Sequence, residues 1–379
     1  MAPGWLTMLL KPSEERCTVR ASRFAAAAAT AAVVFLSACS AADDSDASDS
    51  SKKAATIALF LPESKTTRYE AFDRPLFEAK VKALCADCKV LYSNADQDAA
   101  KQQQQVEAAL TQGADALVLD AVDAGAVASL VNRAKQAKVP VIAYDRLISG
   151  ITYDYYVSFN NVRVGEMQGQ ALLDALGKAG TTGKGKIVMI NGSPTDPSSA
   201  DYKTGAHHVL DGKVTVGREF DTPDWSPDKA QQEMEQAITA LGRDNIVGVL
   251  SANDGMAGGA IAAMKRAGYA TVPPITGQDA ELAAVQRILT GEQYMTIYLD
   301  IRSEAEKAAE LAVGVVHDQK PAAPANVDNG TAKIPSFLLD PIPVTADKIK
   351  DTIVKDGFYT AADICTPPVK AACARQGIQ

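Results

Sequence analysis

The sequence has very few histidines, and the common catalytic motifs are missing. Its three histidines include the adjacent pair His207 and His208, which would point about 100° apart on a helix instead of converging on a metal, so we expect them on the surface. The sequence contains no Gly-x-Ser-x-Gly elbow, and Gly183–Lys186 lacks the spacing and the hydroxyl residue of a phosphate loop. Because no general base is evident, we expect no catalytic residue, no metal, no cofactor and no enzyme activity.

Positive charge and long apolar runs are also scarce. The chain has 38 Lys and Arg against 46 Asp and Glu, a net charge of -8, whereas nucleic-acid binding requires a basic face. We therefore expect no nucleic-acid partner and a ligand that is neutral or cationic. No apolar run reaches the roughly 20 residues of a membrane-spanning helix, but the hydrophobic content of 47% is enough for a globular core.

The beginning of the chain reads as a secretory signal with a lipid-attachment site. Three arginines between positions 16 and 23 precede an apolar segment over 24–36, which ends in the sequence Leu36-Ser37-Ala38-Cys39. A buried alanine-rich helix is the alternative, but the Asp- and Ser-rich residues that follow have nothing to pack. We therefore expect a signal peptide over 1–38, lipid on Cys39, a disordered linker over 39–54, and an extracytoplasmic, membrane-anchored protein.

Four cysteines remain beyond the linker: Cys85, Cys88, Cys365 and Cys373. In an oxidising compartment they indicate two disulfides. Close spacing favours Cys85 with Cys88 and Cys365 with Cys373, although four cysteines allow three pairings. A redox-active Cys-x-x-Cys would need a helix N-terminus, whereas this one follows a helical pattern, so a structural role is favoured.

From Thr56 onward, short β-branched runs alternate with longer amphipathic runs, which is typical of parallel β-α-β units. The predicted strands are too many for one compact domain, so we expect two lobes. The run Gln102–Gln105 is interpreted as a polar helix face. We predict a helix from Thr345 to about Gly357 and another that begins after Ser226. The predicted strands are Thr56–Leu61, Lys89–Ser93, Ala116–Leu119, Val141–Tyr144, Tyr155–Phe159, Lys186–Ile190, Val214–Phe220, Ile246–Leu250 and Pro274–Thr276. The strand-like runs Tyr294–Tyr298 and Phe337–Pro343 do not extend the second set and are interpreted as returns between the lobes.

Polar residues follow most of these strands, at the edge where a parallel sheet binds its ligand. Any one of them could serve only a turn, but together they supply carboxylates, amides, guanidiniums and an aromatic ring. Such groups bind a neutral polyol, so we expect a sugar ligand. The candidates are Glu63, Ser64, Lys65, Arg68, Tyr69, Asp145, Arg146, Asn191, Asp196, Asp224, Trp225, Asn253, Asp254, Gln278 and Asp279.

A series of motifs in order resembles the bacterial periplasmic sugar-binding proteins of the ribose and xylose type. The resemblance covers about Thr56 to Tyr359. The motifs are R-Y-E at Arg68, A-Y-D-R-L-I at Ala143, Y-V-S-F-N-N at Tyr156, V-G-E-M-Q-G-Q-A-L at Val164, G-S-P-T-D at Gly192, D-W-S-P at Asp224, S-A-N-D-G-M-A-G-G-A-I at Ser251, T-G-Q-D-A-E-L-A at Thr276 and D-T-I-V-K-D-G-F at Asp351.

The resemblance implies an α/β type I periplasmic-binding-protein fold, with two doubly wound parallel-sheet lobes joined by a three-crossing hinge. We expect an N-terminal lobe from 55–160 plus 300–337 and a C-terminal lobe from 161–299 plus 338–379. The implied sugar contacts are Arg68, Tyr69, Asp145, Arg146, Asp196, Trp225, Asn253 and Asp279, with Tyr69 in place of a stacking tryptophan. The sequence departs from the family at Pro197 and Ser198, where two asparagines are usual, and at Leu299, where a lysine is usual.

The function implied is capture of a monosaccharide, D-xylose or a similar aldose, and its delivery to an ABC transporter permease by a monomeric receptor. A sensor that reports to a membrane kinase is an alternative. A sugar-responsive transcription regulator is disfavoured because the chain offers an acidic linker instead of a helix-turn-helix.

Overall fold

The computed structural model describes residues 54–379. The predicted signal peptide, the lipid site at Cys39 and nearly all of the linker lie outside the described residues. In the described part of the chain, no helix is both long enough and apolar enough to cross a membrane.

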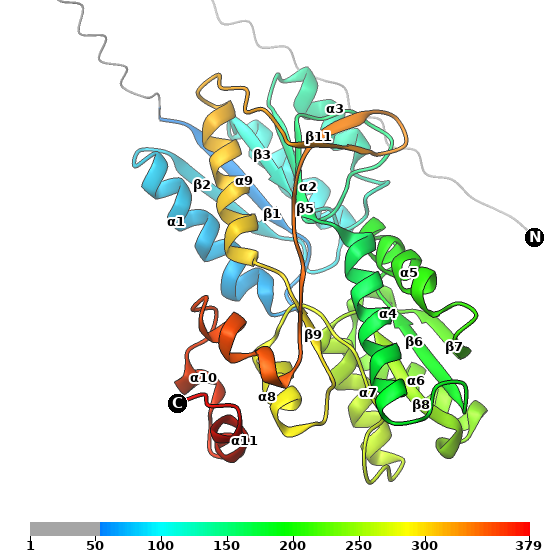
Figure 1. Ribbon diagram of the computed structural model, residues 1–379. Helices are drawn as coiled ribbons and strands as arrows, with labels where there is room; N and C mark the ends of the chain where they lie inside the picture. Colours follow the sequence, from blue (N-terminus) through cyan, green and yellow to red (C-terminus); the bar gives the residue numbers. More distant parts are fainter. Residues whose placement is uncertain (1–53) are drawn as a thin grey trace, which may run out of the picture. The chain divides into compact units, whose positions relative to one another are not determined.

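Within residues 54–379, the larger sheet has seven strands and forms the core of the N-terminal lobe (Figure 1). All neighbouring strands are parallel except the outer pair β10 and β11. In spatial order the strands are β10 (Ala325–Asp328), β11 (Lys333–Leu339), β5 (Tyr155–Phe159), β4 (Val141–Tyr144), β3 (Ala116–Leu119), β1 (Thr56–Leu61) and β2 (Lys89–Asn94).

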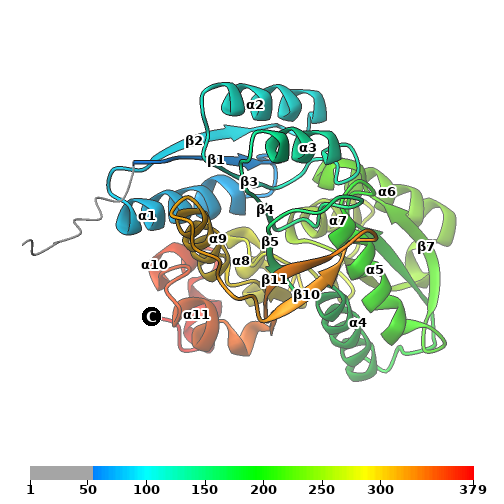
Figure 2. The same cartoon turned by 90° about the horizontal axis from the view of Figure 1, so that it is seen from above.

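Helices cover both faces of this sheet, as Figure 2 shows. One face carries α1 (Arg74–Leu84) and α9 (Ile301–Val315); the other carries α2 (Ala99–Thr111) and α3 (Ala128–Gln136). Successive residues of a strand point to opposite faces, so Leu59 packs under the first pair of helices and Phe60 under the second. Burial on both faces explains why the strands read as continuous apolar runs.

The C-terminal lobe is built in the same way on a smaller parallel sheet of β7 (Thr215–Asp221), β6 (Lys186–Asn191) and β8 (Ile246–Ser251). A short antiparallel pair, β9 (Thr296–Tyr298) and β12 (Ile342–Val344), lies in the same lobe. The predicted strand Pro274–Thr276 forms only an isolated bridge between Ile275 and Val249. The helices of the C-terminal lobe are α4 (Asn161–Lys178), α5 (Pro197–Leu210), α6 (Pro227–Leu241), α7 (Asp254–Arg266) and α8 (Leu282–Thr290).

Within the described residues, the chain passes between the lobes three times: from β5 to α4, from β9 to α9 and from β11 to β12. The last crossing runs through Phe337–Pro343, as expected for a return between the lobes. The first part of this run pairs with β5 in the large sheet, and its end, in β12, pairs with β9. These three crossings form the hinge that the resemblance implies.

Several short helical elements complete the described chain. They are the π-helical turn η1 (Tyr69–Asp73), the 3₁₀ turns η2 (Pro223–Trp225), η3 (Arg243–Asn245) and η4 (Ala346–Lys348), the π-helical turn η5 (Lys350–Val354), and the helices α10 (Ala361–Ile364) and α11 (Lys370–Arg375). The predicted helix from Thr345 is thus a 3₁₀ turn followed by a π-helical turn instead of a regular α-helix. Ser226 caps α6 as expected, since its hydroxyl accepts a hydrogen bond from the backbone N–H of Lys229.

Both disulfides in the described chain join the cysteines that lie close in sequence. Cys85 bonds Cys88 in the turn between α1 and β2. Cys365, directly after α10, bonds Cys373 within α11. The polar-face interpretation of Gln102–Gln105 is wrong for Gln102. Its buried amide donates to the carbonyl of Asp120 and accepts from the N–H of Val122, so it holds the loop after β3.

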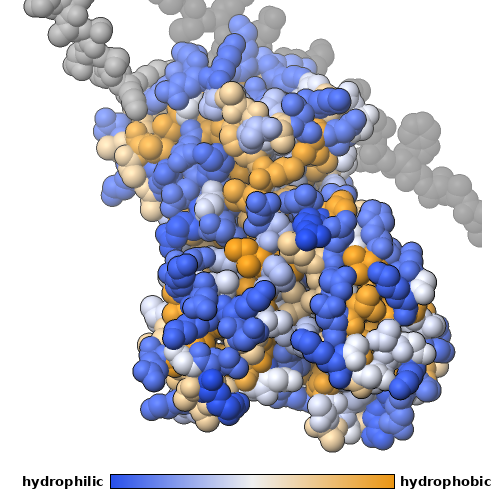
Figure 3. Space-filling view, viewed as in Figure 1, coloured by the Kyte–Doolittle hydropathy of each residue, from blue (hydrophilic) through white to orange (hydrophobic). Residues whose placement is uncertain are grey.

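The surface of the described chain is mostly polar. On the face drawn in Figure 3, hydrophilic residues predominate and apolar residues form separate groups. Among the large hydrophobic residues of the described chain, those with exposed side chains are Leu84 and Ile342.

Helices α4 and α5 pack closely because glycines face the partner backbone. A Cβ added at Gly165 would lie 1.9 Å from the carbonyl oxygen of Tyr202. We expect Gly165→Ala to lower the free energy of unfolding by about 1 to 3 kcal/mol through overpacking, measured by urea denaturation. Gly177→Ala is the matched control, because the same helix has space there, and its expected effect is a gain of about 0.5 to 1 kcal/mol. Equal effects of the two substitutions would contradict this packing argument.

Candidate ligand-binding site

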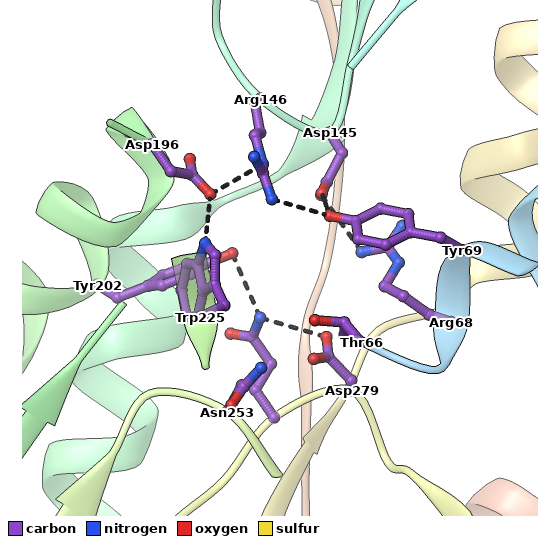
Figure 4. A pocket seen from close by; sticks show the side chains of 11 residues that line it. Thr66, Arg68, Tyr69, Asp145, Arg146, Asp196, Tyr202, Trp225, Asn253 and Asp279 are labelled. Atoms are coloured by element: carbon purple, nitrogen blue, oxygen red, sulfur yellow. Dashed lines mark hydrogen bonds and ion pairs between the residues drawn. The ribbon is translucent and has the colours of Figure 1, made fainter. Parts of the chain in front are cut away.

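A small cavity lies between the two lobes, where the carboxyl ends of both parallel sheets face each other (Figure 4). Every sugar contact predicted from the sequence lies on its wall. The lining residues are Thr66, Arg68, Tyr69, Asp145, Arg146, Asp196, Tyr202, Trp225, Asn253, Gln278 and Asp279.

The N-terminal lobe contributes side chains from the segments that follow β1 and β4. Asp145 binds both residues of the first segment: Nη1 of Arg68 lies 3.2 Å from its Oδ1, and the hydroxyl of Tyr69 donates to its Oδ2 at 3.0 Å. Burial raises the pKa of Tyr69 well above its usual range, so the phenol stays protonated. This half of the pocket is therefore organised around one carboxylate.

Arg68 is also the centre of a buried ion cluster. Its guanidinium contacts the carboxylates of Asp73, Asp145 and Glu304, the last of which lies in the first turn of α9. Burial alone would lower the pKa of Arg68, but the neighbouring carboxylates raise it well above its usual value, so the guanidinium remains charged. The cluster ties the segment after β1 to the helix that follows the second crossing.

The C-terminal lobe places two of its contacts at helix N-termini. Asp196 caps α5 by accepting a hydrogen bond from the N–H of Ser198 at 2.9 Å, and Asn253 caps α7 by accepting one from Met256 at 3.0 Å. Each cap uses one side-chain atom of the residue. The remaining carboxylate oxygen of Asp196 and the amide nitrogen of Asn253 are left for other partners.

Trp225 supplies a flat aromatic wall in the same lobe. Its indole N–H donates to Oδ2 of Asp196 at 3.2 Å, and its ring meets Tyr202 edge to face with centroids 6.3 Å apart. A Cβ at Gly192 would lie 2.0 Å from the indole. The first residue of the Gly-Ser-Pro-Thr-Asp motif must therefore be glycine for the ring to occupy this position.

The backbone is unusual at three of the predicted contacts. Asp145, Trp225 and Asp279 have φ angles of 58°, 52° and 90°, in the left-handed region, which aspartate tolerates but a bulky residue such as tryptophan avoids. Strained conformations of this kind cluster at functional sites.

The two halves meet in a direct ion pair, in which Nε of Arg146 lies 3.0 Å from Oδ2 of Asp196. The N–H of Arg146 Nε is not aligned for a hydrogen bond with Asp196. In the described chain, Nε of Arg146 and Oε1 of Gln278 are both buried without a hydrogen-bond partner. The lining carries the guanidiniums of Arg68 and Arg146 and the carboxylates of Asp145, Asp196 and Asp279. Because the charge is nearly balanced and two polar atoms lack hydrogen-bond partners, the cavity suits an uncharged ligand with several hydroxyls.

The departures from the family have structural explanations outside the cavity lining. Pro197 is the first residue of α5, a position that favours proline, and the hydroxyl of Ser198 accepts a hydrogen bond from Asn161. Leu299 is fully buried in the core of the C-terminal lobe at the second crossing.

The structure also separates pocket residues from turn residues among the candidates. Asp254 is buried but bonds Gln293 and Thr296, so it supports the lobe instead of the cavity. Thr66 and Tyr202 line the cavity although no sequence pattern indicated them, and Gln278, a strand-end candidate outside the predicted sugar-contact set, lines it too. The remaining strand-end candidates do not line the cavity: Glu63, Ser64, Lys65, Asn191 and Asp224.

The fold and the cavity define a binding protein of two hinged lobes. Residues 57–320 match the family described as periplasmic binding protein domain. The chain is 36% identical over 317 residues to the D-xylose-binding periplasmic protein of Haemophilus influenzae, covering 82% of this chain and 92% of the relative. It is 35% identical over 317 residues to the protein of the same name from Escherichia coli, covering 82% and 93%. The chain therefore belongs to the periplasmic binding proteins and is a binding protein, not an enzyme.

Solved structures agree on the fold. A solute binding protein of an ABC transporter from Clostridium phytofermentans, determined with bound β-D-glucose, superposes with a TM-score of 0.74 at 27% identity, covering 82% of this chain and 99% of that one. A carbohydrate transporter solute binding protein from Chloroflexus aurantiacus, in complex with D-glucose, superposes with a TM-score of 0.74 at 28% identity. The match covers 81% of this chain and 97% of that one. The type I periplasmic-binding-protein fold expected from the sequence is confirmed.

Burial is the main cause that raises the pKa of Asp279 to about 7. Between about pH 4 and pH 7 the folded chain then holds a proton that the unfolded chain has released, so this group's contribution to stability falls as the pH rises and levels off above pH 7. We expect Asp279→Asn to have a higher free energy of unfolding than the wild type. This difference should increase by up to about 3 kcal/mol from pH 5 to pH 8.

The measurement is urea denaturation of both proteins at several pH values. Asp228→Asn, at an exposed position in the first turn of α6, is the control, and its difference from wild type should vary little. If the difference in free energy of unfolding between Asp279→Asn and the wild type is the same at every pH, burial does not raise the pKa of Asp279 as stated.

Proposed function

We propose that this protein captures a monosaccharide, D-xylose or a similar aldose, outside the cytoplasm. The observation that carries the proposal is a cavity between the lobes with nearly balanced charge, lined by carboxylates, guanidiniums, amides and the Trp225 ring. Carboxylates accept hydroxyl protons, guanidiniums donate to ring and hydroxyl oxygens, and a flat ring packs against C–H groups of a sugar.

The relatives support a sugar ligand. Their names specify D-xylose for the Haemophilus influenzae and Escherichia coli proteins, and multiple sugars for a Rhizobium radiobacter receptor that is 33% identical over 286 residues. The two structural neighbours were determined with glucose. D-xylose is the ligand that we favour, because the xylose-named relatives align with the largest share of the chain among these sequences.

Binding would act by closing the hinge. Each lobe holds part of the hydrogen-bonding set. Nε of Arg146 and Oε1 of Gln278, one in each lobe, lack hydrogen-bond partners, so a sugar can bond both only when both lobes contact it. A ligand that binds the closed form more tightly shifts the equilibrium toward it by that difference in affinity. The closed form is then the species that a membrane partner recognises.

That partner would be the permease of an ABC transporter, to which a monomeric receptor delivers the sugar. Lipid on Cys39 would hold the receptor at the membrane surface, and the acidic linker over 39–54 would give it reach. The signal sequence and the family together support this extracytoplasmic location.

The proposal is tested by thermal unfolding of the protein with pentoses and hexoses. A ligand at one hundred times its dissociation constant adds about 2.7 kcal/mol to the free energy of unfolding. We expect D-xylose to raise the melting temperature by several degrees and mannitol, an open-chain polyol, to leave it unchanged. If no aldose raises the melting temperature, the proposed function is wrong.

A second test removes the aromatic wall. Trp225→Ala should weaken sugar binding by about 1 to 3 kcal/mol if the ring stacks on the sugar as aromatic rings do on nucleobases, measured by isothermal titration calorimetry. Tyr294→Ala is the control, because that ring contacts Lys178 away from the cavity, and it should bind the sugar normally. Unchanged affinity in Trp225→Ala would remove the indole from the binding site.

A further inference from the structure

A second cluster of metal-ligand side chains lies apart from the sugar cavity. Cys85, Cys88 and His317 are placed so that one ligand atom from each lies within 4.8 Å of the others. Tetrahedral zinc with two sulfur ligands and one nitrogen ligand has ligand atoms roughly 3.3 to 3.8 Å apart, from bond lengths of about 2.0 to 2.3 Å. In the structure the two sulfurs are joined in a disulfide, so they must separate before both can bind one metal ion.

The backbone favours a cation at this place. Helix α1 ends at Leu84, directly before Cys85, and α9 ends at Val315, two residues before His317. The two helices lie side by side on one face of the large sheet (Figure 1). Since the C-terminal end of a helix carries partial negative charge, two such ends at one point stabilise a cation.

The same helix ends disfavour a thiolate that acts alone, so they argue against a catalytic dithiol. They do not disfavour a thiolate that binds a metal, because the metal supplies the positive charge.

His317 provides an independent indication of a ligand. Its Nε2 is buried and has no hydrogen-bond partner among the described residues. A buried imidazole nitrogen without a partner is costly, and a metal would satisfy it. Neither the sugar cavity nor the hinge contacts assign a role to this side chain.

We propose that reduction of the Cys85–Cys88 disulfide creates a zinc site with Cys85, Cys88 and His317 as ligands. A dithiol reductant transfers two electrons to the disulfide, becomes a disulfide itself and leaves two protonated cysteines. Zinc then displaces both thiol protons, and water completes the coordination. Cys88 is partly exposed, which gives the reductant access to its sulfur, whereas Cys85 is buried.

The test uses the full chain with Cys17→Ser and Cys39→Ser, so that four cysteines remain. The protein is reduced, freed of reductant without oxygen and titrated with Zn²⁺ against a chromophoric chelator. Co²⁺ serves as the optical probe for thiolate coordination. We expect one tightly bound zinc in the reduced protein and none in the oxidised protein.

Variants identify the ligands. His317→Ala should weaken zinc binding at least tenfold and change the Co²⁺ spectrum. His208→Ala, at an exposed position, should do neither.

The second disulfide provides a matched control. Cys365→Ser with Cys373→Ser should keep the site, whereas Cys85→Ser with Cys88→Ser should abolish it. Retained sugar binding or an unchanged circular dichroism spectrum would show that each variant is folded. If the reduced protein binds no zinc, or if His317→Ala binds it as tightly as the parent, the proposal is wrong.

Discussion

The buried guanidinium of Arg68 is the interaction on which the cavity depends. A charge removed from water is tolerated only when it is paired, and Arg68 is paired with Asp73, Asp145 and Glu304 at once. Asp145 lies on the cavity wall, and Glu304 lies in the first turn of α9, the helix that follows the second crossing. Because every member needs the others, the segment after β1, the end of β4 and the start of α9 are held in one arrangement. The N-terminal half of the cavity is thereby fixed before any ligand arrives.

The C-terminal half is organised by residues that serve two purposes. Asp196 caps α5 and also receives the indole N–H of Trp225, so the helix start and the aromatic wall are positioned together. The lobes also touch outside the cavity. Phe72 stacks on Phe358 with centroids 4.2 Å apart, and the hydroxyl of Thr195 donates to the carbonyl of Val122 at 3.1 Å. These contacts do not involve a ligand, so a sugar would add to an interface that already brings the lobes together.

Much of this arrangement was predictable from the sequence, because strand ends are local features. A short apolar run bounded by polar residues indicates where a parallel strand stops, and ligands bind at that edge; this is why Asp145, Trp225 and Asp279 could be identified. Where the prediction failed, the pattern was too short or the role depended on packing. Ile275 makes a single bridge because its run is brief, and Gln102 is buried although its neighbours are polar.

The sequence alone determined most of the strands along the chain, the polar residues at their ends and the family. Only the tertiary structure decided which side chains meet. Glu304 contacts Arg68 across 236 positions of the chain, and Tyr202 reaches the cavity from within a helix. His317 comes close to Cys85 only because α9 returns to pack beside α1. The physical reason is that local patterns encode elements, whereas contacts between distant residues depend on how those elements dock.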